Sequence, residues 1–387
     1  MQNKKTITVM FLLNTTVMGG ANISLINLIK ELYKYKIDMY IVHPDNAINP
    51  LFLEETQNMI KAYYKVSLSS QIYYENNNIH QTFRKILKKI LCINWLRKKR
   101  EIYQLSKIVR AVRPDIIHTN TGVIHAGYFV ANKYKIPHVW HIREYQTMDF
   151  NWEIYPSKEK FVSYLKDSYV IAITHDILNY FGLKSTNRSR CVYNGCFSYK
   201  SICTILPKEK FFLCCSRISA EKGQDEVVKA FSLIHKKYGE YRLIIAGFGD
   251  EEYICYLHTL SKELGCDDAI DFVGFKKDIR PYMDHATALI VASRFEGFGR
   301  MTAEAAFRGC MVIGNYTGGT KEILDQIGGM PYSNGYMELA EKMENVIRLR
   351  QYDYKKIIEK AQKVAVELFS NEASAKNVYD LYTSIIH

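Results

Sequence analysis

The sequence predicts an α/β protein of two doubly wound, Rossmann-like parallel-sheet domains. Three observations predict this fold class. The chain has 387 residues, more than one ordinary hydrophobic core organises. Short apolar runs alternate with stretches of helical periodicity, as expected of βα units whose parallel sheets are covered on both faces. The alternation occurs twice, and a hinge is expected near Asn194 and Gly195 between the two series.

The first domain is expected over residues 1–194. The run ITVMFLLN near the start is too short to span a membrane and has no small-residue cleavage site, so it predicts a buried strand rather than a signal peptide. The predicted strands are 7–13, 39–42, 116–118 and 139–141, and the predicted helices include 21–33 and 102–112.

The second domain is expected over residues 195–371. Its predicted strands are 211–216, 242–246, 270–273, 288–292 and 312–314. Its predicted helices are 225–238, 251–264, 279–283, 301–308 and 321–325. The last 50 residues predict helices alone, and a C-terminal helix at about 372–387 is expected to pack back on the first domain. Ligands of such sheets bind at the carboxyl ends of the strands, where loops lead into helices.

Positive charge is concentrated in the first half of the chain. Residues 1–195 carry 27 Lys and Arg against 14 Asp and Glu, a charge of +13, whereas residues 196–387 carry −1. The segment 81–100, QTFRKILKKILCINWLRKKR, has eight basic residues, no acidic residue and apolar residues at helical spacing. Such a helix suits the anionic inner face of the plasma membrane. The alternative is a solvated helix that packs on its own domain. No nucleic-acid motif accompanies the charge, so no nucleic-acid partner is expected.

The sequence contains no pattern typical of a metal or dinucleotide cofactor. The nine cysteines are scattered with no C-x-x-C pair, and no D-x-D or G-x-G-x-x-G motif occurs. No metal and no other cofactor are therefore expected, and a dehydrogenase is disfavoured.

Two predicted strand-to-helix loops have features of an anion site. In NTTVMGGAN, Gly19 and Gly20 open a helix, where backbone amides can approach an anion at the positive helix end. In SRISAEKGQ, Arg217 leaves a buried strand and Lys222 precedes the next helix. Two cations at this spacing can clamp a diphosphate and stabilise it as it leaves. The structural alternatives are a tight turn and ordinary surface charges.

A third loop, RFEGFGRMTAEAAFRGC, carries two carboxylates eight residues apart. Glu296 precedes a helix rich in small residues, and Glu304 lies inside it. A carboxylate accepts hydrogen bonds from vicinal hydroxyls, so a pair suits a sugar and a ribose. A favourable charge at the helix N-terminus would account for one glutamate only. Downstream, Gly318 and Gly319 open another helix and predict a second group of backbone amides beside this loop.

Seven segments, in this order and spacing, resemble glycosyltransferase family 4. They are MGGAN, IPHVWHIRE, SRISAEKG, GFGDEE, FVGF, SRFEGFGRMTAEA and TGGTKEI. The resemblance covers nearly the whole chain, and its most specific part is the E-x7-E element with the upstream Arg and Lys. It implies the GT-B fold, in which two Rossmann-like domains face each other across the active-site cleft. It also implies sugar transfer from a nucleotide diphosphate with retention at the anomeric carbon and no required metal.

The resemblance implies roles for residues of the donor site. Arg217 and Lys222 would hold the diphosphate as leaving group, Glu304 would bind the ribose, and Glu296 would bind the transferred sugar. The remaining implied donor contacts are the amides of Gly297, Phe298 and Gly299, the Gly318–Gly319 pair, the base-side loop at Gly274 and Phe275, and Gly19 and Gly20 over the phosphates.

The resemblance also implies an acceptor side in the first domain. His141 corresponds to the family's histidine near the sugar and acceptor, although a hydrogen-bonded core histidine is the plain structural alternative. Arg143 and Glu144 follow on the same loop, and His118 and Asn120 end a neighbouring strand, so all four are acceptor candidates.

One position departs from the family pattern. Many members carry an acidic residue where Asn22 stands, which is expected to affect how the glycine loop closes.

The expected function is a retaining hexosyltransferase that acts on a saccharide acceptor, expected to be lipid-linked, in bacterial capsule, lipopolysaccharide or other surface polysaccharide synthesis. The expected location is cytoplasmic, at the inner face of the plasma membrane. A nucleotide-sugar 2-epimerase of the same fold and a non-catalytic carbohydrate-binding protein remain alternatives.

Overall fold

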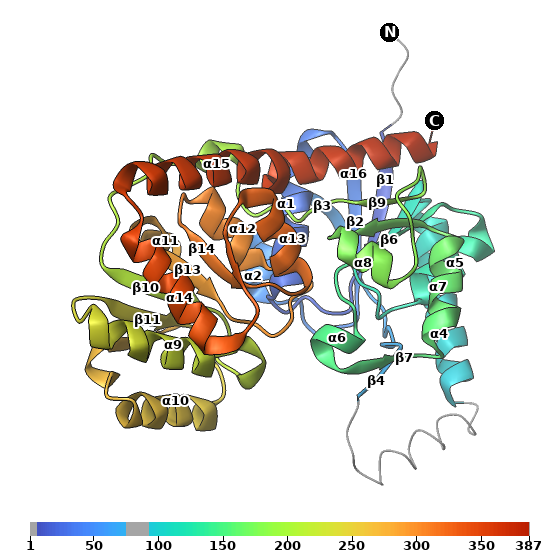
Figure 1. Cartoon of the computed structure of the whole chain (residues 1–387). Coiled ribbons are helices and arrows are strands. Elements are labelled where there is room, and N and C mark those ends of the chain that lie inside the picture. The colour runs from blue at the N-terminus through green and yellow to red at the C-terminus, as the bar shows by residue number, and fades with distance from the viewer. Residues whose placement is uncertain (1–5, 75–92, 387) are drawn as a thin grey trace. The chain divides into compact units, whose positions relative to one another are not determined.

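The structure is a computed structural model that describes residues 6–74 and 93–386 (Figure 1). The chain forms two compact units, one of residues 1–195 with 374–387 and the other of residues 196–373. These boundaries lie one and two residues from the predicted 194/195 and 371/372. Each unit is an α/β domain with a parallel sheet and helices on both of its faces (Figure 1), as the predicted fold class requires.

The first unit has a seven-stranded parallel sheet in the order β3-β2-β1-β5-β6-β8-β9. Its strands are β1 (Thr8–Leu12), β2 (Asp38–His43), β3 (Ile60–Lys65), β5 (Ile116–Thr119), β6 (His138–Ile142), β8 (Tyr169–Ala172) and β9 (Ser189–Cys191). A small antiparallel pair, β4 (Ile72–Tyr74) with β7 (Trp152–Ile154), stands apart from it. Its helices are α1 (Gly20–Lys34), α2 (Pro50–Thr56), α4 (Ile93–Val112), α5 (Ala126–Tyr134), α6 (Thr147–Phe150), α7 (Lys158–Lys166), α8 (His175–Tyr180) and α16 (Asn371–Ile386).

Both faces of the first sheet are buried, because successive side chains of a strand point to opposite faces. In β1, Val9 and Phe11 belong to one core and Met10 and Leu12 to another. The first core includes α1 and α16, and the second includes α4 and α5. The C-terminal helix α16 therefore packs on the first unit, with Tyr382 fully buried there.

The second unit has a six-stranded parallel sheet in the order β12-β11-β10-β13-β14-β15. Its strands are β10 (Phe211–Cys215), β11 (Arg242–Ala246), β12 (Ile270–Gly274), β13 (Ala288–Val291), β14 (Val312–Asn315) and β15 (Met330–Tyr332). Its helices are α9 (Gln224–Lys237), α10 (Glu251–Glu263), α11 (Arg280–His285), α12 (Arg300–Phe307), α13 (Gly318–Ile327), α14 (Gly335–Arg348) and α15 (Gln351–Phe369). Short 3₁₀ turns are η1 (Tyr199–Ser201), η2 (Ala220–Lys222) and η3 (Asp267–Ala269). The strand order reverses between β10 and β13, which is where ligands of such sheets bind.

The predicted elements agree with the structure mainly where apolar runs are long. The five strands predicted in the second unit end within one residue of the observed ones. The helix predicted at 102–112 is the second half of α4, which begins nine residues earlier. Of the predicted basic segment 81–100, residues 93–100 belong to α4, and residues 81–92 lie outside the described residues.

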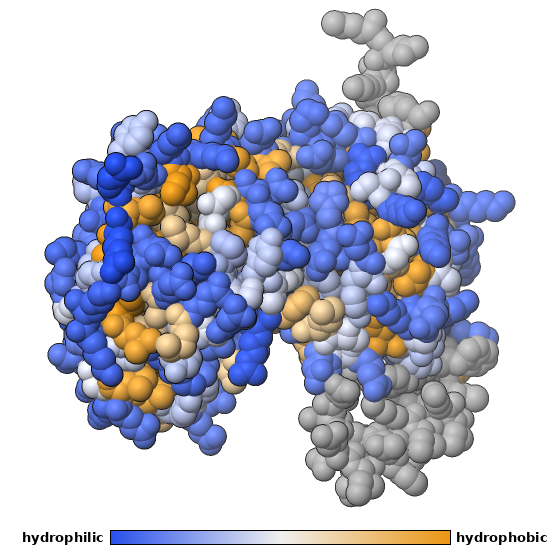
Figure 2. Space-filling view, viewed as in Figure 1, coloured by the Kyte–Doolittle hydropathy of each residue, from blue (hydrophilic) through white to orange (hydrophobic). Residues whose placement is uncertain are grey.

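Hydrophilic side chains cover most of the face drawn in Figure 2, and hydrophobic ones form separate small groups there. Within residues 6–74 and 93–386, no helix combines the length and the apolar character needed to cross a membrane.

Candidate functional site

The loops after β10 and β13 of the second unit enclose a cavity of about 200 Å³. These two strands are neighbours in the sheet, so their carboxyl ends open at the same edge. Three of the predicted donor-site side chains line the cavity, Arg217, Lys222 and Glu296. The other lining residues are Cys214, Cys215, Ser216, Ile290, Val291, Ala292, Ser293, Gly299, Arg300 and Met301.

The predicted residues Lys222 and Glu296 lie in direct contact across the cavity. The Lys222 Nζ donates to Oε1 of Glu296 at 2.6 Å, and both side chains are partly buried. Arg217 forms an ion pair with Glu221 and is more exposed. Each of the three side chains thus has a protein partner, which a bound anion or hydroxyl would have to replace or share.

The backbone that carries Arg217 is fixed by a buried amide side chain. Gln224 is fully buried at the start of α9, and its Nε2 donates to the Ser216 Oγ and the Arg217 carbonyl oxygen, each at 2.9 Å. Beside it, Gly223 has a φ of +68°, and a Cβ there would lie 2.3 Å from the Ala292 carbonyl oxygen. The sequence alone gave no reason to single out Gln224.

Glu304 does not line the cavity, although it was predicted in the donor site. Glu304 is a buried residue of α12, and its Oε1 forms an ion pair with the Arg300 Nε at 2.5 Å. Burial raises the pKa of Glu304, and the neighbouring Arg300 opposes that rise. Arg300 does line the cavity and was missed by the sequence reasoning. Its position four residues before Glu304 on one helix was the available signal.

The two glycine-rich loops that were predicted in the donor site are hydrogen-bonded to each other. The Gly319 N–H donates to the Glu296 carbonyl oxygen at 2.8 Å, and a Cβ at Gly318 would lie 2.6 Å from the same oxygen. The segment between Glu296 and α12 comprises Gly297, Phe298 and Gly299; the Phe298 side chain is buried and packs against Phe369. These contacts fix the backbone around Glu296.

The predicted base-side loop is separate from the cavity lining. Gly274 ends β12 with a φ of +65°, and Phe275 after it is 66% exposed. Its ring meets that of Phe248, equally exposed, with 5.7 Å between ring centroids. The two rings form an open aromatic surface on the loops that follow β12 and β11.

In the first unit, Gly19 and Gly20 begin α1 at the carboxyl end of β1. A Cβ on either glycine would meet no atom of the described residues within 4 Å. Asn22, the departure from the family pattern, is buried and its Nδ2 donates to the carbonyl oxygens of Thr15 and Val17. Asn22 therefore holds the loop that leads into the two glycines.

The five predicted acceptor-side residues of the first unit are all buried, and four of them form one network. The Arg143 guanidinium donates through Nε and NH2 to the Asn120 Oδ1, at 3.0 and 2.8 Å. Its NH1 donates to the Asn194 Oδ1 at 2.6 Å, and its NH2 lies 3.4 Å from the His141 Nδ1. His118 lies on the other side of His141, with 3.3 Å between Nε2 and Nδ1.

The fifth residue, Glu144, belongs to a separate contact set. Its Oε1 accepts hydrogen bonds from the Thr121 hydroxyl at 2.6 Å and the Gly122 N–H at 2.7 Å. Burial raises the pKa of Glu144 to about 7, despite these hydrogen bonds. Its carboxyl group therefore titrates near neutral pH.

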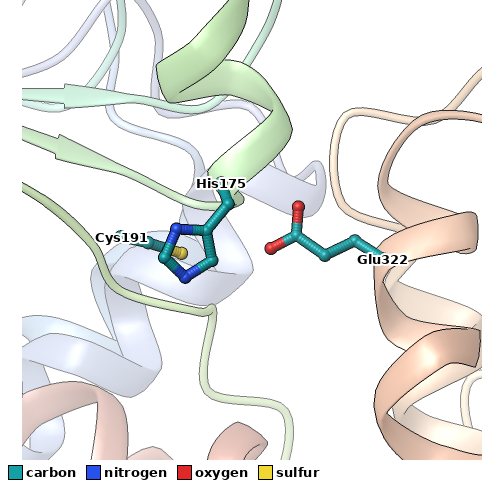
Figure 3. A group of neighbouring side chains, drawn as sticks. All are labelled: His175, Cys191 and Glu322. Atoms are coloured by element: carbon teal, nitrogen blue, oxygen red, sulfur yellow. The ribbon is translucent and has the colours of Figure 1, made fainter. Parts of the chain in front are cut away.

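Figure 3 draws three side chains of the kinds that bind metals, His175, Cys191 and Glu322. His175 and Cys191 belong to the first unit and Glu322 to the second. Within one unit the group offers only two ligand atoms, fewer than the three or four protein ligands of zinc sites. We assign no metal to it.

Comparison with known proteins agrees with the fold. Residues 200–364 match the family model described as glycosyl transferases group 1. Over 163 residues the chain is 26% identical to an uncharacterized glycosyltransferase of Haemophilus influenzae, covering 40% of this chain and 44% of that one. The chain thus spans less than half the length of this curated relative.

Two further comparisons extend over most of the molecule. An uncharacterized 42.6 kDa protein in the cps region of Klebsiella pneumoniae is 25% identical, over 79% of this chain and 83% of its own. The crystal structure of Anabaena Alr3699/HepE in complex with UDP superimposes with a TM-score of 0.75 at 18% identity, over 98% of this chain and all of that one. Residues 200–364 thus resemble group 1 glycosyltransferases, and the chain as a whole shares the GT-B fold.

Proposed function

We propose that this chain, whose residues 200–364 match group 1 glycosyltransferases, is a retaining family 4 enzyme that transfers a hexose-type sugar from a nucleotide diphosphate to an acceptor hydroxyl. The observation that carries the proposal is the convergence of Arg217, Lys222 and Glu296 on one cavity at the carboxyl ends of β10 and β13. Two cations suit a diphosphate, and the carboxylate suits sugar hydroxyls. The UDP bound to the Anabaena protein of similar fold supports the same class of donor.

The proposed reaction breaks one bond and makes one bond at the anomeric carbon. The bond to the diphosphate oxygen breaks, its electron pair stays on that oxygen, and Arg217 and Lys222 stabilise the charge that develops there. The acceptor oxygen bonds to the same face of the anomeric carbon, and its proton passes to the departing phosphate oxygen. No protein base and no metal are required in this scheme.

The proposed acceptor is a saccharide, lipid-linked, in the synthesis of a bacterial surface polysaccharide. The Klebsiella relative, described as lying in a cps region, supports this process. The charge of +13 on residues 1–195 supports an anionic acceptor or membrane surface at the inner face of the plasma membrane.

Thermal denaturation with a panel of nucleotide diphosphate sugars tests donor binding. A ligand present at 100 times its dissociation constant stabilises a protein by about 2.7 kcal/mol. At least one nucleotide sugar is expected to stabilise the wild type, and Lys222→Ala is expected to reduce this effect. The matched control is Lys229→Ala, which removes a lysine from an ion pair with Asp225 outside the cavity.

Two results would overturn the donor-site assignment. One is that no nucleotide sugar stabilises the wild type, and the other is that Lys222→Ala is stabilised as much as Lys229→Ala. A donor that is bound and released as its 2-epimer in the absence of acceptor would replace the proposal by the epimerase. Binding with no turnover under any acceptor would replace it by a carbohydrate-binding protein.

A further inference from the structure

A chain of buried polar groups in the first unit connects the C-terminal helix to His141. The Oη of Tyr382, in α16, lies 2.5 Å from the Nδ1 of His118, which belongs to the carboxyl half of β5. The His118 Nε2 lies 3.3 Å from the His141 Nδ1, in the neighbouring strand β6. The Arg143 NH2 lies 3.4 Å from that same Nδ1. All four side chains are buried.

Arg143 determines which nitrogen of His141 carries the proton. A guanidinium only donates hydrogen bonds, so the His141 Nδ1 beside it has to be the unprotonated, accepting nitrogen. The proton of a neutral His141 then resides on Nε2.

The same reasoning extends outward to Tyr382. Because the His141 Nδ1 is a hydrogen-bond acceptor, the His118 Nε2 has to be protonated and to donate a hydrogen bond to it. A neutral His118 then accepts at Nδ1, and the Tyr382 hydroxyl donates to it. One assignment of protons is compatible with all these contacts, and in it the His118 Nε2–H and the Arg143 NH2 share the single lone pair of the His141 Nδ1.

The electrostatics agree with neutral rings in this assignment. Burial, reinforced by the Arg143 charge, holds the pKa of His118 and of His141 well below the usual value. Burial raises the pKa of Tyr382 well above its usual value, so its hydroxyl stays protonated and can donate a hydrogen bond to His118.

The other nitrogen of His141 has no hydrogen-bond partner in the described part of the chain. Among the described residues, no hydrogen-bond acceptor meets the buried His141 Nε2. A buried N–H without an acceptor destabilises the protein, and an oxygen atom of a ligand can remove this cost by accepting the hydrogen bond. The nitrogen that the network leaves unused is thus the one that bears the hydrogen.

We propose that Tyr382 and His118 are positioning residues that, with Arg143, hold His141 as a neutral hydrogen-bond donor whose Nε2–H is reserved for an oxygen atom of a bound substrate. The part of this inference that concerns a substrate rests on the proposed function, whereas the tautomer of His141 follows from the contacts alone. It makes α16 part of the site, because the last helix of the chain supplies the first donor of the relay. It also excludes His141 as the base that removes the acceptor proton, since its Nδ1 lone pair is occupied and its Nε2 is protonated.

Nitrogen NMR of ¹⁵N-histidine-labelled, unliganded protein tests the tautomer directly. His141→Gln and His118→Gln identify the two sets of signals among the eleven histidines. Both rings are expected to be neutral from pH 6 to 8, each with a protonated Nε2 and an unprotonated Nδ1. A charged ring, or a proton on the His141 Nδ1, would overturn the proposal whether or not the protein transfers sugars.

Substitution of Tyr382 by Phe tests the relay. The ring that fills the core remains, and only the hydroxyl is lost. The His118 Nδ1 signal is expected to move, and kcat for transfer is expected to fall about five- to tenfold with KM little changed, the effect of about one hydrogen bond. The matched control is Tyr379→Phe. Tyr379 lies on the same helix as Tyr382, but its ring stacks on that of Tyr35, at the end of α1, and is not part of the relay.

His118 variants separate positioning from packing. Glutamine at position 118 can still donate to the His141 Nδ1, whereas phenylalanine cannot. His118→Gln is therefore expected to retain more activity than His118→Phe, and to keep the Nε2–H form of His141. Equal loss in both variants, or a Tyr382→Phe protein identical to Tyr379→Phe in spectrum and rate, would refute the positioning role.

Discussion

At the scale of single residues, the charged side chains of the site are already engaged with one another. Lys222 pairs with Glu296 across the cavity, and Glu304 pairs with Arg300 inside α12. A free cavity with these groups unpaired would carry a larger cost of isolated charge. Under the proposed function, a bound donor would replace or share the partners of Lys222 and Glu296. The Arg300–Glu304 pair is the more buried of the two ion pairs.

The sequence could predict the identities of these residues but not all of their contacts. Arg217, Lys222 and Glu296 were each predicted in loops that follow buried strands, and the resemblance to glycosyltransferase family 4 assigned all three to one donor molecule. Glu304 was predicted to bind ribose, but no pattern showed that its carboxylate is held by Arg300. Tyr382 lies more than 260 residues from its partner His118, a distance that no local pattern spans.

Glu144 gives a pH prediction at the same scale. Its carboxyl has a pKa of about 7 in the folded protein, raised by burial from the usual 4.5. Between pH 4.5 and 7 the folded state keeps the Glu144 proton while the unfolded chain loses it. The contribution of Glu144 to the free energy of unfolding is therefore complete below pH 4.5 and is lost as the pH rises to about 7. At 1.36 kcal/mol per pKa unit, the loss is about 3 kcal/mol.

Glu144→Gln cannot titrate at this position and should remove that pH dependence. Urea unfolding of the two proteins between pH 4 and 8 measures it. The variant is expected to gain stability relative to the wild type as the pH rises from 4.5 to 7, and to keep that advantage above pH 7. Parallel stability curves would show that the carboxyl titrates in the same range in both states.

At the scale of elements, the loop between β10 and α9 depends on one glycine. Gly223 has a left-handed φ of +68° and no room for a Cβ, because of the Ala292 carbonyl oxygen. Gly265 has nearly the same φ, +67°, with nothing within 4 Å. Alanine substitutions at these two glycines therefore separate the cost of the left-handed backbone conformation from the cost of the clash with the Ala292 carbonyl oxygen.

Gly265→Ala is expected to lose about 1 kcal/mol of stability, the cost of a left-handed conformation for alanine. Gly223→Ala is expected to lose more, and to lose nucleotide-sugar binding as well, because Ala292 and Lys222 both have to move. Urea unfolding and thermal shifts with the donor measure the two effects. Equal stability losses, with donor binding intact in both variants, would contradict the role of this loop.

Some elements could not be predicted because their sequences lack the usual signals. β9 is only three residues, Ser-Arg-Cys, with no apolar run, and it joins the first sheet because β8 supplies hydrogen bonds, which is a tertiary effect. β8 is different, because its sequence Tyr-Val-Ile-Ala is an apolar run that the prediction missed. The strands of the second unit were predictable because most of them are short, apolar and bounded by turns.

At the scale of the whole molecule, the two units share an architecture but differ in charge. All of the excess positive charge belongs to residues 1–195, which carry +13, while residues 196–387 carry −1. Charge of one sign on one half attracts anionic surfaces and loses strength as salt increases.

This asymmetry predicts binding to anionic vesicles. Replacing Arg84, Lys85, Lys88 and Lys89 with Gln should weaken the binding free energy for phosphatidylglycerol vesicles by about 4 kcal/mol, at about 1 kcal/mol for each charge. Co-sedimentation with the vesicles measures this loss. The matched control replaces four exposed lysines of α15, namely Lys355, Lys356, Lys360 and Lys363. If both quadruple variants sediment like the wild type, the segment 81–100 is not a membrane contact.

The central claim is sugar transfer by the charged cavity of the second unit. It is tested most directly by incubating the protein with the stabilising nucleotide sugar and a bacterial glycolipid extract, and measuring both nucleoside diphosphate release and the mass of the acceptor. The wild type should release one nucleoside diphosphate for each hexose added, and Lys222→Ala should reduce kcat by about 10²- to 10³-fold, the effect of removing one group that stabilises the leaving charge. Equal rates of acceptor glycosylation by the wild type and Lys222→Ala, or no glycosylated acceptor with any nucleotide sugar, would contradict the claim.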